Sequence, residues 1–296
     1  MGKGNNRELA RQYLVNFPGY LKWGASKLAE KLDVSHADIV DIKTELRLND
    51  KPFRRLFFDI ETSYNIAKVW RTGWKLNIGP HQIIQERKVI SVSWKWHDED
   101  KVHNLAWDKD QCDKSMLISF NKVLEQADEV IGHNSDRFDI PWLRTRCLYH
   151  RIPFRTYIKS FDTLKKVKSA FNFQSNKLDY IASFLGFGHK LPTNMALWDR
   201  IILNKEPEAL KEMVEYCDHD VVLLEDVYNE IIAYVKPVTH VGVAEGGNKC
   251  SCPNCGSGDT KLLDNQFTAL GTIRRHVGCN DCDSDFIVSN TAWTKA

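Results

Sequence analysis

Apolar and polar positions alternate most clearly over residues 89–96, Val-Ile-Ser-Val-Ser-Trp-Lys-Trp, and this period of two predicts a β-strand. A shorter apolar and aromatic run at Leu56–Glu61 predicts another strand before it. A third strand is expected over 102–107, after a turn at Asp98-Glu-Asp100. Three strands with no helical pattern between them indicate an antiparallel meander.

Helical periodicity begins near residue 114 and changes the expected class from all-β to mixed. We expect helices at 114–127, 140–150, 177–185 and 207–235, and a further strand at Glu129–Gly132. Antiparallel strands followed by a strand among helices are typical of a mixed α/β domain. We place this domain at residues 55–237.

Residues 1–50 form a separate helical segment. Apolar residues recur at helical spacing in three runs, and the third run begins after Ser35, whose spacing from Asp38 predicts a capping box. Three short helices, the last two joined by a tight turn, resemble a helix-turn-helix. A plain helical hairpin packed on the main domain is an equal alternative.

The end of the chain is expected to be a further small domain. Gly242, Gly246 and Gly247 indicate a linker over residues 238–248, followed by a cysteine-rich segment at 249–296. No stretch approaches the roughly 18 consecutive apolar residues that a membrane span needs, and the polar start lacks the apolar region of a signal peptide. We therefore expect a cytoplasmic protein with no membrane partner.

Composition and charge narrow the class further. Hydrophobic residues make up 43% and charged residues 27%, which excludes a disordered or fibrous protein. The net charge is +2, and the basic excess lies in residues 1–55, with 11 Lys and Arg against 7 Asp and Glu. An excess of cations favours docking of a phosphate backbone there. The middle, 56–247, carries 25 basic against 27 acidic residues, which is consistent with a site built from carboxylates.

Two carboxylates share one face of the first strand. Because side chains alternate between the faces of a strand, Asp59 and Glu61 project together while Phe58 and Ile60 project from the other face. Unpaired carboxylates raise each other's pKa, and a divalent cation between them removes the repulsion. The pair indicates a metal site, with a solvated strand end as the simpler alternative.

A second acidic motif is Asn134-Ser-Asp136-Arg-Phe138-Asp139-Ile-Pro141. It passes from a strand end into a helix with proline in its first turn, and Asp139 stands at that junction. A carboxylate at a helix N-terminus is electrostatically favoured. Capping is therefore the simpler alternative for Asp139.

The third motif lies in the helix expected at 207–235. Tyr216 and Asp220 are four residues apart, so they share a face of the helix. Asp218 and His219 point elsewhere and are expected at the surface. A tyrosine hydroxyl and a carboxylate are thereby predicted to be neighbours above one site.

The order Phe-Asp-Ile-Glu-Thr, Asn-x-x-x-Phe-Asp and Tyr-x-x-x-Asp resembles the three motifs of the DEDD superfamily, in its DEDDy-type 3′–5′ exonucleases. More narrowly, the chain is similar to the proofreading domain of family B DNA polymerases and to stand-alone phage and bacterial exonucleases with a C-terminal zinc ribbon. The resemblance covers roughly residues 55–235. It implies an RNase H-like α/β fold, a mixed five-stranded sheet flanked by helices.

The resemblance also implies the activity, a 3′–5′ exonuclease that hydrolyses phosphodiester bonds of DNA with two Mg²⁺ or Mn²⁺ ions about 4 Å apart. The residues that would bind the metal ions are Asp59, Glu61, Asp139 and Asp220. Tyr216 would orient the attacking water, since the sister variety has histidine at the position of Glu215 here. Roles in DNA replication or repair, with a DNA polymerase or another replication protein as partner, follow as expectations, in a bacterium or in the host cytoplasm if the protein is phage-encoded.

Several aromatic and basic residues are candidates for holding the strand, because aromatic faces and cations suit single-stranded nucleic acid. The candidates are Asn134, Phe138, Trp70, Arg71, Trp74, Lys165 and Lys166. Packing in a hairpin core is the alternative for the tryptophans. A solvated helix face is the alternative for the lysines. Asp162 falls outside the three motifs and is expected to be structural.

Paired cysteines in the last fifty residues indicate a structural Zn²⁺ site and not disulfides. The expected ligands form two Cys-x-x-Cys turns, Cys252 with Cys255 and Cys279 with Cys282. Cys250 and His276 could substitute for one ligand. Arg274 and Arg275 make contact with nucleic acid plausible for such a ribbon.

Two alternatives to a DNA exonuclease stay open. One keeps the chemistry and changes the substrate to RNA. The other is a nucleic-acid-binding regulator or assembly factor, in which the helix-turn-helix and the ribbon carry the function and the nuclease domain is silent. The presence of every motif carboxylate argues against a silent domain.

Overall fold

The structure is a computed structural model that describes residues 3–16, 25–48, 53–73 and 75–295. The chain divides into two compact units. One is formed by residues 54–238, and the other by residues 1–53 together with 239–296.

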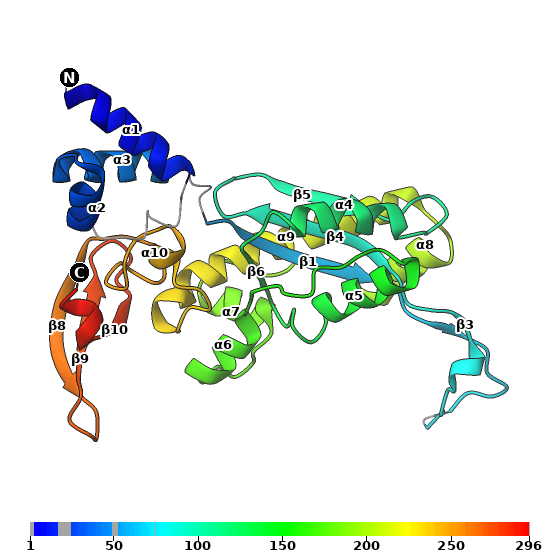
Figure 1. Ribbon diagram of the computed structural model, residues 1–296. Coiled ribbons are helices and arrows are strands. Elements are labelled where there is room, and N and C mark those ends of the chain that lie inside the picture. The colour runs from blue at the N-terminus through cyan, green and yellow to red at the C-terminus, as the bar shows by residue number, and fades with distance from the viewer. Residues whose placement is uncertain (1–2, 17–24, 49–52, 74, 296) are drawn as a thin grey trace. The chain divides into compact units, whose positions relative to one another are not determined.

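A five-stranded mixed sheet forms the centre of the unit at 54–238 (Figure 1). Its strands are β1 (Arg55–Thr62), β4 (Val89–Trp96), β5 (Val102–Ala106), β6 (Glu129–Gly132) and β7 (Ser160–Asp162). They lie in the order β5-β4-β1-β6-β7. β1, β4 and β5 pair antiparallel, and β1, β6 and β7 pair parallel. The mixed five-stranded sheet expected from the sequence is confirmed, and so is its antiparallel meander.

Helices cover both faces of this sheet. They are α4 (Lys114–Leu124), α5 (Asp139–His150), α6 (Thr163–Ala170), α7 (Leu178–Phe184), α8 (Met195–Ile202) and α9 (Pro207–Ile231), the last followed by a 3-10 turn at Ile232–Tyr234. Phe58 and Ile60 of β1 pack with α4 and α5, whereas Phe57 packs with α6, α7 and α9. Since side chains alternate along a strand, Asp59 and Glu61 belong to the face that α9 covers.

β4 is buried along its whole length, although its sequence alternates apolar and polar residues. The reason is that its polar face packs on α9 and not on solvent. Ser93 donates a hydrogen bond to Asp218 of α9 at 2.6 Å, and Lys95 forms an ion pair with Glu225. Asp218, expected at the surface, is instead a half-buried link between helix and sheet.

The sequence patterns did not predict β7, α6, α8 or a short two-stranded ribbon after β1. The ribbon pairs β2 (Ile66–Ala67) with β3 (Ile83–Gln85), and a 3-10 turn at Pro80–Gln82 precedes β3. β2, β3 and β7 are two or three residues long, too short for a periodic pattern to develop. We refer to residues 63–88 as the arm.

The other unit contains three helices at the beginning of the chain, α1 (Lys3–Asn16), α2 (Ala25–Leu32) and α3 (His36–Leu48). A small apolar core joins them, formed by Ala10, Leu14, Leu28, Ile39, Ile42 and Leu46. The serine half of the predicted capping box is confirmed, because Ser35 Oγ accepts a hydrogen bond from the Asp38 amide at 3.0 Å and α3 begins after it. The Asp38 carboxylate accepts from the Ser35 hydroxyl at 2.6 Å. Asp41 lies exposed on α3, whereas Asp38 is half-buried and paired with Arg7.

The same unit contains the cysteine-rich segment. A short helix, α10 (Val241–Ala244), lies in the stretch expected to be a linker. Strands β8 (Thr260–Phe267), β9 (Ile273–Cys279) and β10 (Asp285–Ser289) form an antiparallel sheet, followed by α11 (Asn290–Trp293). No helix in the described ranges is long and apolar enough to cross a membrane.

Candidate active site

β1 carries Asp59 and Glu61 to the sheet face under α9. The carboxylate oxygens of Asp59, Glu61 and Asp220 all lie within 4.8 Å of one another. Cys217 of α9 is buried against Asp59, with its thiol 3.6 Å from the Asp59 carbonyl oxygen and 3.8 Å from Oδ2. The structure thus brings one carboxylate of α9 to the pair on β1.

Asp139 is the first residue of α5 and is 3% exposed. Its Oδ1 accepts a hydrogen bond from the backbone amide of Ile60 at 3.2 Å. This bond fixes the start of α5 to β1 between Asp59 and Glu61. Burial, followed by the negative charge of Asp59, raises the pKa of Asp139 well above the ordinary aspartate value.

α9 brings Tyr216 and Asp220 to the same place. Asp220 is 1% exposed; its Oδ2 accepts a hydrogen bond from Lys190 Nζ at 2.6 Å, while its buried Oδ1 has no hydrogen-bond partner among the described residues. The Tyr216 hydroxyl lies 3.5 Å from the same Nζ. Burial and the charge of Asp220 raise the pKa of Tyr216 to about 12, so its hydroxyl is neutral at physiological pH.

The crowded carboxylates resist ionisation. Burial, and then the charge of Asp220, raises the pKa of Asp59 from 3.8 to about 7. Burial and the charge of Asp59 likewise raise the pKa of Glu61 well above its ordinary value. Mutual repulsion in a poorly solvated site disfavours the charged forms, and a bound cation reverses that balance.

Lys190 is a site residue that the sequence did not reveal. It stands in the connection between α7 and α8, outside the three motifs, where an isolated lysine carries no signal. Its amide donates to Asp179 Oδ1 at 2.8 Å, and the carbonyl of His189 is hydrogen-bonded to His219 Nε2 at 2.9 Å. His219 therefore fastens this connection to α9. Although burial opposes the charge of Lys190, the carboxylates of Asp220 and Asp59 hold its pKa above the ordinary lysine value.

The donor set fits a divalent metal ion. Carboxylate oxygens are the ligands that Mg²⁺ and Mn²⁺ prefer. Three such groups converge, and Asp220 Oδ1 is a buried acceptor without a hydrogen-bond donor among the described residues. Lys190 currently supplies the positive charge next to Asp220.

The candidate strand-holding residues are not all gathered around the carboxylates. Lys165 is exposed and paired with Asp136 at 2.6 Å, and Lys166 Nζ donates to the carbonyl of Lys236 at 2.5 Å. Phe138 is half-buried against the apolar cluster under α4 and α5. Trp70 is 104% exposed, so packing in a hairpin core is wrong for this tryptophan. Arg71 is also exposed on the arm, and Trp74 lies outside the described residues.

Asn134 belongs to a loop held by Asp162. It has a left-handed backbone with φ of 68°, and its amide donates to Asp162 Oδ1 at 3.0 Å. Asp162 also caps α6 by accepting from the Lys165 amide, and it accepts from the Asp136 amide at 3.3 Å. These three bonds give Asp162 the structural role expected for it.

A cavity of about 590 Å³ adjoins Lys190 and Asn134. Its basic residues are Lys168, Lys177 and Lys190, and Asp179 is the acidic residue that lines it. Asn176 Oδ1, also in the lining, is buried without a hydrogen-bond partner in the described part of the chain. The cavity therefore places positive charge and an unsatisfied polar atom beside the carboxylate cluster.

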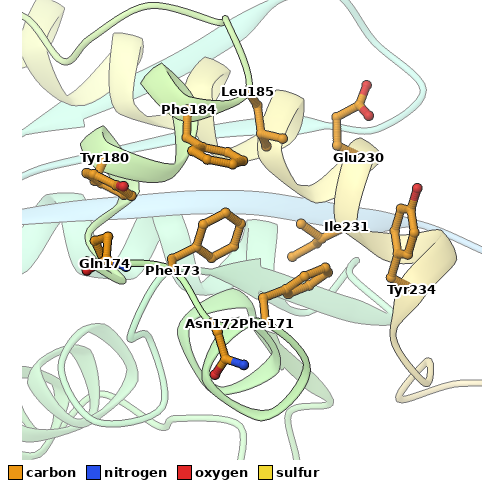
Figure 2. Close-up of a pocket in the computed structure, with 10 residues that line it drawn as sticks. All are labelled: Phe171, Asn172, Phe173, Gln174, Tyr180, Phe184, Leu185, Glu230, Ile231 and Tyr234. Carbon is orange, nitrogen blue, oxygen red and sulfur yellow. The ribbon is translucent and has the colours of Figure 1, made fainter.

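A second cavity, of about 420 Å³, is aromatic (Figure 2). Figure 2 shows Phe173 between Phe184 and Phe171, with Tyr234 and Ile231 beyond them. Glu230 is the charged residue of its lining. It offers neither the cations nor the clustered carboxylates of the first site.

The four cysteines of the expected zinc site come together between the two Cys-x-x-Cys turns. Cys252 Sγ lies 3.6 Å from Cys282 Sγ, and Cys255 Sγ lies 3.6 Å from Cys279 Sγ. All four sulfur atoms lie within 4.8 Å of one another, close enough for one ion. Neither of the two alternative ligands, Cys250 and His276, belongs to this cluster. Cys250 Sγ lies 3.9 Å from the Ala292 carbonyl, and His276 is paired with Asp264 and Asp285.

A family model described as the RNase_H superfamily matches residues 81–232, slightly more than half of the chain. The chain belongs to the RNase H superfamily. The mixed five-stranded sheet flanked by helices agrees with this family. The matched segment includes Asp139, Tyr216 and Asp220, while β1 with Asp59 and Glu61 precedes it.

No curated protein matches the chain. Among solved structures, the chain is similar to the family B DNA polymerase from the hyperthermophilic archaeon Pyrobaculum calidifontis, with 14% sequence identity and a TM-score of 0.49. The similarity covers 74% of this chain and 31% of the polymerase. The chain therefore spans less than a third of that polymerase's length.

Proposed function

We propose that the protein is a metal-dependent 3′–5′ exonuclease that removes nucleotides from the 3′ end of single-stranded DNA. The observation that supports this most is the convergence of Asp59, Glu61, Asp139 and Asp220 from three separate elements, with Tyr216 beside them. Each carboxylate is buried or half-buried, an arrangement that is unfavourable without a bound cation.

Asp59 lies in the cluster with Glu61 and Asp220, and its charge also acts on Asp139. In this proposal the four carboxylates would hold two Mg²⁺ or Mn²⁺ ions: Asp59 would contribute to both sites, Glu61 and Asp220 to one, and Asp139 to the other. When bound, the ions would neutralise the developing charge on the phosphate and lower the pKa of the attacking water. The amide of Ile60 keeps Asp139 oriented toward the site.

Tyr216 positions water and does not act as a base. Its pKa of about 12 keeps the hydroxyl protonated at physiological pH, so it donates or accepts a hydrogen bond without exchanging charge. Lys190 lies beside Tyr216 and Asp220 and also lines the basic cavity. As a fixed cation, Lys190 holds a phosphate of the strand next to the carboxylates.

The test is a time course with 3′- and 5′-labelled single-stranded DNA and RNA of matched sequence, with Mg²⁺, Mn²⁺ or a chelator, beside an Asp139→Ala control. Metal-dependent shortening of DNA from the 3′ end, absent in the control, is the expected result. Preferential shortening of RNA would identify an exoribonuclease of the same superfamily. Intact substrates with every metal would favour the binding regulator.

One observation weighs against base reading by the helices at the beginning of the chain. Asp41 is exposed on α3, at the position of a recognition helix, and a carboxylate there repels a phosphate backbone. We therefore assign these helices no part in sequence recognition. A DNA polymerase or another replication protein that presents a 3′ end is a partner class that fits the proposed activity.

We further propose that Cys252, Cys255, Cys279 and Cys282 bind one Zn²⁺ ion. Four thiolates fill a tetrahedral site, so the ion has no open position for catalysis and serves the fold. Of the two arginines expected to contact nucleic acid, Arg275 is bonded to Asn265 and Asn290 within the ribbon. Its role in this proposal is structural.

A further inference from the structure

The arm has the most exposed large hydrophobic side chain of those described. Trp70 is 104% exposed, and Ile84, Ile78 and Val69 are 66%, 46% and 40% exposed. An exposed indole gains nothing from the core of the protein, and apolar side chains gathered on one projecting element mark an interaction surface. Figure 1 shows the arm extending away from the sheet.

The charge of the arm indicates which class of partner it binds. Between Ser63 and Gln85 the sequence has no aspartate or glutamate, but it has Lys68, Arg71 and Lys75. All three cations are exposed, and none is paired with a carboxylate of the described chain. Cations interleaved with an exposed aromatic ring fit the phosphates and bases of a single strand.

The root of the arm is fixed beside the carboxylate cluster. Ser63 donates its amide to the Lys88 carbonyl at 2.8 Å, and Tyr64 donates its hydroxyl to Asp199 of α8 at 2.6 Å. Arg87 lies over the ring of Trp142 in α5, 5.2 Å from its centre. The arm therefore starts from a rigid base only two residues after Glu61.

We propose that the arm is a second nucleic-acid contact, which grips the strand several nucleotides away from the bond being cut. The inference rests on the proposed exonuclease function, and it adds that kcat/KM depends on substrate length. The nine residues from Glu61 to Trp70 span at most about 30 Å. That reach corresponds to roughly nine stacked nucleotides at ~3.4 Å each.

The experiment compares Trp70→Ala with wild type on a 20-nucleotide and a 4-nucleotide single strand, measuring kcat/KM for each. Wild type should prefer the longer strand. Trp70→Ala should lose about tenfold on it, the loss of one base-stacking contact, and nothing on the tetranucleotide. Tyr157→Ala, another isolated aromatic that is 89% exposed, is the matched control and should resemble wild type on both.

A measurement without catalysis separates this inference from the proposed function. In a chelator, the Kd of a labelled 20-nucleotide strand should rise about tenfold in Trp70→Ala and in the double variant Lys68→Gln, Arg71→Gln. If wild type cuts neither strand but this rise is seen, the exonuclease proposal fails and the contact stands. Equal kcat/KM losses on both strand lengths, or an unchanged Kd, would overturn the arm as a distal grip.

Discussion

The carboxylate cluster and the cysteine cluster both contain metal ligands, but the apolar packing around them differs. The carboxylates lie over a sheet whose apolar clusters cover both of its faces. The cysteines lie in a ribbon whose strand β8 is exposed beyond Thr260. The buried residues of the ribbon's strands are Val277, Gly278, Cys279 and Val288. The carboxylate site lies in a domain that has its own apolar core, whereas the cysteine site has little buried apolar surface besides its ligands.

This difference in packing predicts what a metal ion contributes at each cluster. At the carboxylates a cation relieves repulsion that the folded domain already tolerates, so its removal should cost activity and little structure. At the cysteines a cation supplies the attachment that apolar burial does not, so its removal should cost structure. The predictions below separate these two roles.

The largest expected effect is on activity. Asp59→Asn keeps the shape of the side chain but removes the charge that we propose contacts both metal ions. Turnover should fall by about 10³-fold or more, because each ion supplies several kcal/mol of transition-state stabilisation. Asp136→Asn is the matched control, since Asp136 is paired with Lys165 outside the cluster. Comparable activity of Asp59→Asn and wild type would remove the carboxylates from the mechanism.

The next effect is structural and belongs to the ribbon. Cys279→Ser, or a chelator that removes Zn²⁺, should abolish the protection of the β8–β10 amides against hydrogen exchange and leave β1 and β4 protected. Cys250→Ser, which changes a cysteine outside the cluster, should leave both regions protected. Ribbon protection that survives in Cys279→Ser would mean that the ribbon folds by itself.

Tyr216 gives a smaller effect on activity. Tyr216→Phe removes the hydroxyl and keeps the ring, so kcat should fall by roughly 10- to 100-fold while KM changes little, as for the loss of one positioning group. Lys190→Met should do the reverse and mainly raise KM, because Lys190 holds phosphate in the proposed mechanism. If Tyr216→Phe instead raised KM and Lys190→Met instead lowered kcat, the assigned roles would be wrong.

The sequence was most informative where local periodicity and geometry decide the structure. Strand alternation placed Asp59 and Glu61 on one face, and helical spacing placed Tyr216 and Asp220 together. The two Cys-x-x-Cys turns carried enough spacing information to identify the four cysteines that meet. In each case the relevant neighbours are only two to four residues apart.

The sequence was least informative where distant segments decide the structure. Lys190 lies 30 residues before Asp220 in the sequence, and no repeat or motif links the two positions. The polar face of β4 is buried because Asp218 and Glu225 arrive from α9, a contact that periodicity within β4 cannot reveal. Trp70 looked equally suited to a core or to a surface, and only the projection of the arm decides between them.

The smallest expected effect sharpens the comparison through pH. Asp59 has a pKa of about 7 in the fold against 3.8 ordinarily, so metal-free folded protein holds a proton that the unfolded chain releases. The stability that protonated Asp59 contributes is therefore present at low pH and is lost as pH rises from about 4 through 7.

Without metal, Asp59→Asn should melt above wild type by roughly 4 °C or more at pH 8, and by less at pH 5. The same variant would then be inactive and more stable, as expected when charges serve function at the expense of the fold. Melting curves in a chelator at both pH values, beside Asp136→Asn, make the measurement; a difference that shrinks as pH rises would contradict the crowding of these carboxylates.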